Sequence, residues 1–129
     1  MILFKAENGR VYQNKLKFQF YNQIDGRLRA LLLELGDFTK RELNVPVTIT
    51  GLNRTKEENA KVNGSEWSAH LFGRAVDIRT SVFTEAEVKK IMSHIDFLWG
   101  DMIYVLHHNV GSGMHLHVNI KYSYRWRRK

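Results

Sequence analysis

A chain of 129 residues with 43 % hydrophobic and 26 % charged residues has the size and composition of one soluble globular domain, which argues against disordered and fibrous architectures. No apolar run approaches the roughly 20 residues that a membrane helix needs, and the absence of cysteine excludes disulfides, thiolate metal sites and cysteine nucleophiles. The net charge is +7, but residues 121–129 hold five cations and no acid, and +7 less these five leaves +2 for residues 1–120.

The N-terminal half changes its hydrophobic period along the chain. Residues 16–20 alternate between apolar and polar side chains, which predicts a half-buried strand or an extended lead-in. Apolar side chains then recur every three or four positions, and this predicts an amphipathic helix over residues 22–43. Alternation returns in residues 45–50, which favours a strand. Residues 51–64 are polar and rich in turn formers, with one helical turn expected at residues 56–62.

The C-terminal half contains three expected strands and one helix. Residues 75–79 alternate as a strand does. Thr84 and Glu87 form a capping box, which predicts that a helix begins there. Residues 102–106 and 114–120 are strand-like and form a hairpin. Because strands and helices do not alternate as parallel units require, the sequence predicts an α+β fold, a small antiparallel sheet with flanking helices.

The last predicted strand carries two histidines. The alternation of residues 114–120 places His115, His117 and Asn119 on the face opposite to the apolar side chains. Two imidazoles at this spacing can share one site. The same pattern also suits an exposed polar face without a ligand, so the strand alone leaves both interpretations open.

A second group of polar residues lies upstream. His70 leaves a polar loop, Gly73 permits a turn, and Asp77 follows on the non-core side of the next strand. This spacing allows the imidazole and the carboxylate to converge. Catalytic zinc takes three protein ligands of nitrogen or oxygen and keeps one open position. His70, Asp77 and one of the C-terminal histidines supply such a set.

The motif Ser-x-His-x-x-Gly-x-Ala-x-Asp at residues 68–77, followed by His-x-His at residues 115–117, resembles that of the zinc D-alanyl-D-alanine peptidases. This family includes peptidoglycan carboxypeptidases, D,D-dipeptidases and the L-alanyl-D-glutamate endopeptidases of phage lysins, and shares the hedgehog/DD-peptidase fold. The resemblance extends upstream: residues 50–55 look like the family's segment with a substrate-binding arginine, and residues 59–64 like its polar stretch. In all it covers about residues 45–120.

The resemblance implies a zinc centre. His70 and Asp77 match the first two zinc ligands of the family, and His117 matches the third. The first histidine of the pair, His115, corresponds to a residue beside the metal-activated water, where it polarises that water or stabilises the oxyanion.

The resemblance also implies contacts with the substrate. Arg54 matches an arginine that orients the substrate carboxylate or the polarised carbonyl, for which a planar guanidinium is well shaped. Ser68 matches a serine that donates a hydrogen bond to the substrate. The reaction implied is zinc-assisted amide hydrolysis.

One position departs from the family pattern. Many relatives have an acidic general base three residues before the last zinc ligand, where this chain has Met114. The base is therefore open. The candidates, in order of preference, are His115, then His107 or His108, with Asp101 and Glu66 as carboxylates that folding could bring near.

The basic C-terminal segment interleaves Tyr122, Tyr124 and Trp126 with its cations. This pattern suits a nucleic acid, an anionic polymer or a membrane surface, and equally aromatic side chains that pack back on the domain. A nucleic-acid binder would leave the histidine and aspartate spacing unexplained. We therefore expect no nucleic-acid partner and associate the charge with an anionic cell envelope.

Taken together, the sequence predicts one zinc peptidase domain over residues 1–129 that hydrolyses a peptidoglycan stem-peptide bond involving a D-amino acid. Carboxypeptidase and endopeptidase activity both remain open, and one form that such an enzyme can take is a phage endolysin. The alternative is a non-catalytic, zinc-dependent cell-wall binding module. We expect a monomer without membrane insertion that is made in the cytoplasm without a signal peptide and acts on the bacterial cell wall.

Overall fold

The computed structural model describes residues 1–62, 64, 68–109 and 113–121. These residues form an α+β fold, as the sequence predicts. The elements, with η marking a 3-10 helix, are β1 (Ile2–Phe4), α1 (Arg10–Asn22), α2 (Gly26–Leu43), β2 (Val47–Gly51), α3 (Lys56–Lys61), η1 (Ala69–Phe72), β3 (Ala75–Arg79), α4 (Glu85–Trp99), η2 (Gly100–Met102), β4 (Ile103–Asn109) and β5 (Met114–Ile120).

The five strands form one mixed sheet in the order β1-β2-β3-β5-β4. β2, β3, β5 and β4 are antiparallel to their neighbours, as predicted, whereas β1 runs parallel to β2. The antiparallel arrangement that the sequence predicts therefore holds for four strands, and the edge strand β1 departs from it. β1 has three residues, too few to show a periodic pattern, and it is held by the distant pairing of Phe4 with Ile49.

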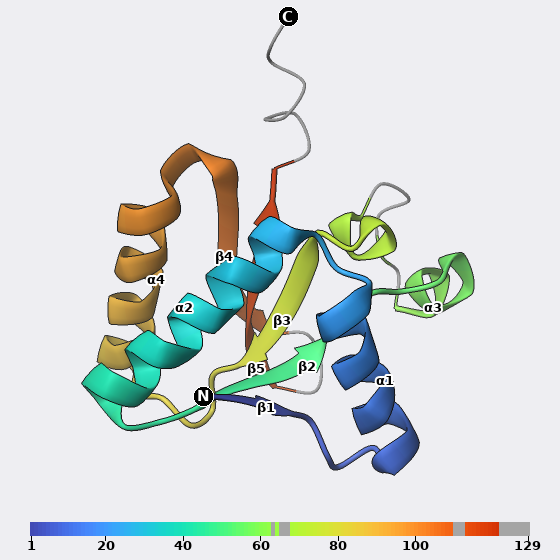
Figure 1. Ribbon diagram of the computed structural model, residues 1–129, viewed down its shortest axis with the longest axis horizontal. Coiled ribbons are helices and arrows are strands. Elements are labelled where there is room, and N and C mark those ends of the chain that lie inside the picture. The colour runs from blue at the N-terminus through green and yellow to red at the C-terminus, as the bar shows by residue number, and fades with distance from the viewer. Residues whose placement is uncertain (63, 65–67, 110–112, 122–129) are drawn as a thin grey trace, which may run out of the picture.

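Helices α2 and α4 cover one face of the sheet, and α1 packs beside β1 and β2 (Figure 1). Apolar side chains of the sheet and these helices form one core, because the inward positions of each element are apolar. Its most deeply buried members include Leu16, Phe20, Leu28, Leu32, Leu35, Val47, Ile49, Val76, Ile78, Ile95, Leu116, Val118 and Ile120.

Helix α1 corrects the prediction of an extended segment at residues 16–20. Leu16 and Phe20 are buried, four positions apart on one helical face, whereas Phe18 between them is 57 % exposed. The alternation of apolar residues therefore arose from two opposite faces of a helix. Phe20 packs edge-on against Phe4, with ring centroids 5.7 Å apart, and joins α1 to the sheet.

Helix α2 begins at Gly26, later than the predicted residue 22, because Asp25 caps it. The Asp25 carboxylate accepts a hydrogen bond from the backbone N–H of Arg27 at 2.8 Å and pairs with its guanidinium, also at 2.8 Å. The hydrogen bond from the Arg27 side chain lowers the pKa of Asp25 below its ordinary value.

The variant Asp25→Ala is expected to lose about 1 kcal/mol of unfolding free energy at pH 7, since it removes an N-cap. The lowered pKa means that this stabilisation is complete above the ordinary aspartate pKa of about 3.9 and is lost as the pH falls through the folded-state value. Urea unfolding at pH 7 and pH 3 measures the effect. A difference between wild type and variant that did not shrink at the lower pH would contradict the assignment.

Helix α4 begins at the predicted capping box, where Thr84 Oγ1 accepts from the Glu87 backbone N–H at 3.1 Å. Its partner α2 is held through His94, whose ring stacks on Phe38 with centroids 3.6 Å apart. His94 Nε2 also lies 2.9 Å from the Glu34 carboxylate. These contacts fix the two helices against each other on the covered face of the sheet.

The predicted hairpin is confirmed, with a longer first strand that includes His107 and His108. Residues 110–112, between its two strands, lie outside the described part of the chain, as do residues 122–129 of the basic segment.

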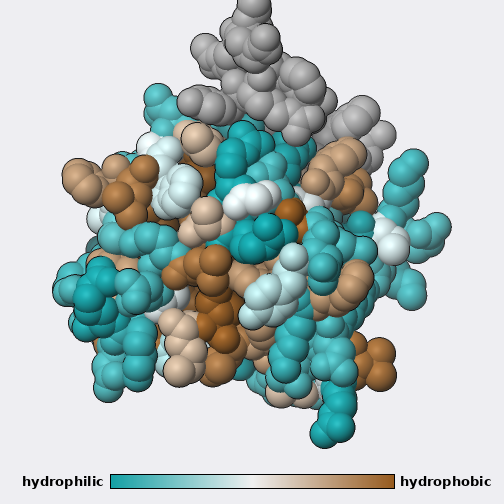
Figure 2. All heavy atoms as spheres, viewed as in Figure 1, coloured by the Kyte–Doolittle hydropathy of each residue, from teal (hydrophilic) through white to brown (hydrophobic). Residues whose placement is uncertain are grey.

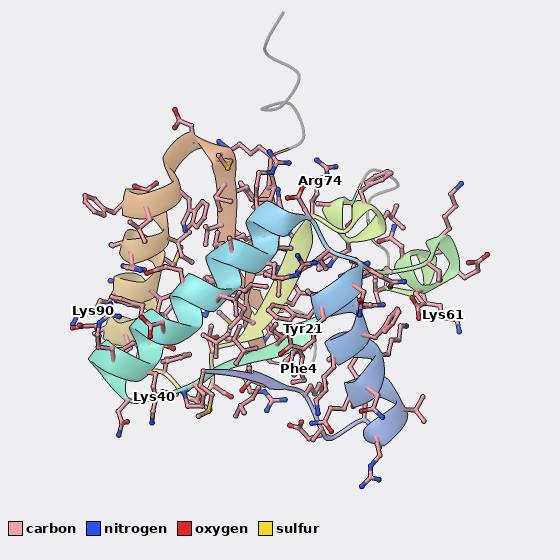
Figure 3. The ribbon with its side chains drawn as sticks, in the orientation of Figure 1. Phe4, Tyr21, Lys40, Lys61, Arg74 and Lys90 are labelled. Atoms are coloured by element: carbon pink, nitrogen blue, oxygen red, sulfur yellow. The ribbon has the colours of Figure 1, made fainter. Side chains whose placement is uncertain are left out.

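Hydrophobic residues gather near the centre of the face in Figure 2, with hydrophilic side chains around them. Lys40, Lys61 and Lys90 project outward from their helices (Figure 3). Among the described residues, no helix is both long and apolar enough to cross a bilayer.

Candidate metal centre

Strands β3 and β5 place an aspartate beside a histidine. Asp77 on β3 is directly opposite His117 on β5 in the antiparallel register. The residues on either side of each, such as Val76 and Leu116, are buried in the core. Because side chains alternate along a strand, Asp77 and His117 both project from the face that α2 and α4 leave uncovered.

The 3-10 helix η1 brings the third side chain to the same place. The Ser68 hydroxyl caps η1 by accepting a hydrogen bond from the His70 backbone N–H at 3.2 Å. Gly73 ends η1 with φ at 70°, a left-handed conformation that favours glycine, and turns the chain into β3 as predicted. The Arg54 N–H donates to the His70 carbonyl at 2.9 Å, which ties η1 to the segment after β2.

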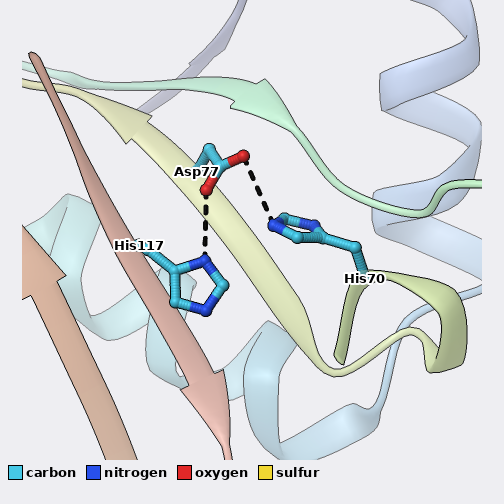
Figure 4. Close-up of side chains that lie close together, drawn as sticks. All are labelled: His70, Asp77 and His117. Atoms are coloured by element: carbon cyan, nitrogen blue, oxygen red, sulfur yellow. Dashed lines mark hydrogen bonds and ion pairs between the residues drawn. The ribbon is translucent and has the colours of Figure 1, made fainter. Parts of the chain in front are cut away.

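The three side chains converge on a common point (Figure 4). His70 Nε2 lies 3.3 Å from Asp77 Oδ2, and His117 Nδ1 lies 3.3 Å from Asp77 Oδ1. Ligand atoms placed tetrahedrally at the 2.0–2.1 Å bond lengths of zinc are separated by about 3.3 Å. Candidate ligand atoms of the three residues all lie within 4.8 Å of one another, so the spacing fits a small cation.

The environment of His70 shows why a cation suits this point. Its Nδ1 lies 2.6 Å from the Leu52 carbonyl oxygen, which accepts only, so Nδ1 carries the hydrogen. In the neutral ring, Nε2 is then a bare lone pair. This atom is buried, faces the Asp77 carboxylate and has no hydrogen-bond partner among the described residues. A cation between His70 Nε2 and the Asp77 carboxylate would interact favourably with both groups.

The Asp77 carboxylate is suited to such a ligand role. Burial is the largest influence on its pKa and raises it, but when the facing nitrogens of His117 and His70 are protonated, their hydrogen bonds and charge together outweigh burial. The net effect holds the pKa of Asp77 well below its ordinary value. The group is therefore ionised at neutral pH, as a metal ligand must be.

Arg54 lies next to the cluster and is held in place by two groups. Its Nη2 is 3.7 Å from Asp77 Oδ2, and its Nη1 donates to Asn59 Oδ1 at 3.1 Å. Asn59 is buried on α3, and its backbone carbonyl accepts a hydrogen bond from the Gly64 N–H at 2.8 Å. The backbone of Gly64 approaches the Asn59 amide so closely that a Cβ at residue 64 would overlap Oδ1.

The variant Gly64→Ala is therefore expected to displace the Asn59 amide and release Arg54, with a loss of about 1–3 kcal/mol of stability from overpacking. Urea unfolding and the chemical shift of the Arg54 side chain would report the two effects. Gly26→Ala is the matched control, because a Cβ there meets no atom within 4 Å. Equal behaviour of the two variants would contradict the packing argument.

Three hollows are lined by Asp77, by Arg54 or by His115. One of about 240 Å³ lies beside Asp77 and is lined by Tyr12, Lys15 and Arg54. A larger one of about 700 Å³ lies between α3 and η1 on the other side of Arg54. Arg54 therefore stands between two spaces that can receive parts of a peptide. A third, of about 390 Å³, is lined by Glu7, Arg79 and His115.

His115, the predicted neighbour of the activated water, lies on the same face of β5 as His117 but outside the group of three candidate ligands. It is 6 % exposed, and its Nδ1 lies 3.0 Å from the Gly113 carbonyl oxygen. Since that oxygen only accepts, Nδ1 carries the hydrogen and Nε2 is the basic atom of the neutral ring. Its role remains a prediction.

The other candidate bases differ in their positions. His107 pairs with the core residue Leu116, so it lies on the opposite face of the sheet, where its Nε2 is 3.0 Å from Thr80 Oγ1. His108 pairs with His115 on the site face, and its ring centroid is 6.5 Å from that of His117. Asp101 is exposed in η2. Glu66 lies outside the described residues.

The fold and this cluster are those expected of a metallopeptidase, and a comparison with known families agrees. A family profile described as Peptidase M15 matches residues 11–117, so the chain belongs to the Peptidase M15 family. Members of this family are zinc peptidases that act on peptidoglycan peptides, and they share the hedgehog/DD-peptidase fold. Among curated protein sequences, none matches the chain.

Sequence reasoning brought the three clustered residues together through the family motif but missed their supports. Asn59 stood inside the polar stretch that resembled the family, yet nothing in the sequence showed that it is buried against Arg54. The role of the Leu52 carbonyl could not be predicted from the sequence, because every residue has a backbone carbonyl and the residue type does not show what it binds. These supports follow from the three-dimensional path of residues 51–62 and 64.

Proposed function

We propose that the chain is a zinc-dependent peptidase that hydrolyses an amide bond involving a D-amino acid in the peptidoglycan stem peptide. The observation that carries the proposal is the convergence of His70, Asp77 and His117, with the buried Nε2 of His70 facing an ionised carboxylate. Two imidazoles and one carboxylate are a donor set that zinc accepts, with one coordination position left open.

In the proposed site, His70 Nε2, Asp77 and His117 Nδ1 would hold the zinc ion. A zinc ion there would supply Lewis-acid polarisation of the scissile carbonyl and a water acidified to a pKa of about 7. The hydrogen bond from His70 Nδ1 to the Leu52 carbonyl leaves the lone pair of Nε2 facing Asp77, where the metal would bind. The protein contribution is thus a rigid and partly buried donor set.

Arg54 is proposed to orient the substrate. Its guanidinium faces Asp77 from the edge of the cluster and lies between the two hollows, where it can bind a substrate carboxylate or carbonyl in a bidentate manner. Ser68 is proposed to donate a hydrogen bond to the peptide. Its hydroxyl oxygen accepts from the His70 N–H, and a hydroxyl that accepts one hydrogen bond still carries a hydrogen that it can donate.

His115 is proposed to move the proton. Its Nε2 is the bare nitrogen of the neutral ring, and it projects from the same face as His117. A base of this kind accepts a proton from the attacking water and returns it to the leaving amine. His108, on the same face, is the second candidate, whereas His107 on the other face is not.

A non-catalytic zinc-dependent cell-wall binding module is the second candidate function. The observation that favours it is Met114, which stands where many relatives have the acidic base and is 40 % exposed. Zinc and a muropeptide would then bind without hydrolysis. For the enzyme, we propose the role of a phage endolysin that acts on the bacterial cell wall as a monomer.

The test is digestion of purified sacculi by the protein with zinc and after removal of zinc with a chelator. Mass spectrometry of the products should show a new terminal amine and a truncated stem peptide in the zinc sample alone. Release of a terminal D-alanine would identify a carboxypeptidase, and cleavage within the stem an endopeptidase. Binding of muropeptide without any product would overturn the enzymatic proposal in favour of the binding module.

A further inference from the structure

The neighbour of His117 along β5 suggests an additional part of the metal centre. Asn119 projects from the same face of the strand, two residues further on, and its Oδ1 lies 2.8 Å from His117 Nε2. It is not one of the three candidate ligands, and it lies beyond the residues 11–117 that match the family profile. Its contact with His117 is therefore an observation about this chain alone.

The orientation of the Asn119 amide is set by a second hydrogen bond. Its Nδ2 donates to the Ile120 carbonyl oxygen at 3.2 Å, which leaves Oδ1 facing the imidazole. An amide oxygen accepts and cannot donate, so His117 Nε2 must carry the hydrogen of the neutral ring. His117 Nδ1 is then a bare lone pair directed at the Asp77 carboxylate, 3.3 Å away.

Asn119 thus acts on His117 as the Leu52 carbonyl acts on His70: each accepts a hydrogen bond from the imidazole nitrogen that points away from Asp77. At His70 the outer nitrogen Nδ1 donates and Nε2 faces Asp77; at His117 the outer nitrogen is Nε2 and Nδ1 faces Asp77. Without the acceptor on its outer side, His117 would be free to take the other tautomer. Its Nδ1–H would then donate to Asp77 and compete with a metal for both groups.

We propose that Asn119 is a positioning residue that holds His117 in the tautomer able to bind zinc, an inference that rests on the proposed function. Partners of this kind, which hydrogen-bond the outer nitrogen of a ligating histidine, typically change metal affinity by about 10- to 100-fold when removed. Asn119→Leu keeps the size of the side chain and removes the acceptor. It should weaken zinc binding by about this factor.

The experiment measures zinc affinity by competition with a chromophoric chelator for wild type, Asn119→Leu and Asn119→Asp. Asn119→Asp retains an acceptor and should bind zinc within a few-fold of wild type. The control is Asn22→Leu, which also loses an amide that donates to a backbone carbonyl, at 3.1 Å, but lies at the end of α1. It should bind zinc as wild type does.

A second measurement reports the tautomer without zinc or activity. Imidazole ¹⁵N spectra of the metal-free protein at roughly pH 9, above the ordinary histidine pKa of about 6.5, should show a hydrogen on His117 Nε2 in wild type. In Asn119→Leu the hydrogen should move in part to Nδ1. A merely structural role for Asn119 would leave this spectrum unchanged.

The outcomes separate this inference from the function on which it rests. If wild type binds zinc and Asn119→Leu binds it equally, with the same His117 spectrum, the positioning role is wrong and the proposed function stands. If wild type binds no zinc, both are wrong. If Asn119→Leu does not fold, Asn119→Asp decides, since a loss of zinc affinity in that folded variant would overturn the role.

Discussion

Asp77→Asn is expected to remove zinc binding and to lower peptidase activity by about a thousandfold or more, the largest functional effect of any single change that the structure suggests. The asparagine keeps the shape of the side chain but loses its charge. Its Nδ2–H₂ would donate to one imidazole lone pair and so occupy a nitrogen that the metal needs. Metal-ion polarisation contributes several kcal/mol to such a reaction, and about 4 kcal/mol converts to this factor.

The measurement combines zinc content by mass spectrometry with the initial rate on sacculi. Asp37→Asn serves as the control, because Asp37 is exposed on α2 and pairs with Arg41, far along the chain from the site. We expect that variant to retain both zinc and activity. Stoichiometric zinc and full activity in folded Asp77→Asn would show that the cluster is not the metal centre.

The largest effect on stability is expected from Phe20→Ala, at about 3–5 kcal/mol. Phe20 is 1 % exposed and fills the space between α1 and the sheet, so truncation leaves a cavity as well as losing apolar burial. Domains of this size have total stabilities of about 5–15 kcal/mol. The change should therefore lower the urea midpoint by about 2 M, given slopes of about 1–3 kcal/mol per molar urea.

Phe18→Ala on the same helix is the matched control and should cost about 0.5 kcal/mol or less, since Phe18 is exposed. Loss of α1 packing should also affect the site. Tyr12 on α1 donates to the Thr50 carbonyl at 2.7 Å, and Gln19 Oε1 accepts from the Asn53 N–H at 3.2 Å. Similar unfolding midpoints for the two variants would contradict the assigned role of Phe20.

The elements that could be predicted are those whose hydrophobic pattern matches one buried face. β3, β5, α2 and α4 are of this kind, and the capping box at Thr84 marked the start of α4. α1 was mistaken for an extended segment because exposed Phe18 falls between buried Leu16 and Phe20. β1 was missed because its pairing with β2 spans more than forty residues and leaves no local signal.

In the candidate site, too, some residues could be predicted from the sequence and others could not. His70, Asp77 and His117 could be named in advance because their spacing forms a motif, and the structure brings them together. Their supports depend on atoms rather than residue types. Asn119 was visible from the sequence as a polar neighbour of His117 on one strand face, but only the positions of its Oδ1 and Nδ2 show which imidazole nitrogen it binds.

The most direct test of the zinc centre is a crystal structure of the zinc-loaded protein with anomalous diffraction collected at the zinc absorption edge. We predict one strong anomalous peak about 2.0–2.2 Å from His70 Nε2, an Asp77 carboxylate oxygen and His117 Nδ1, with a fourth position open to solvent. A zinc ion bound elsewhere, or a cluster that stays empty at saturating zinc, would contradict the assignment of these three residues as the metal centre.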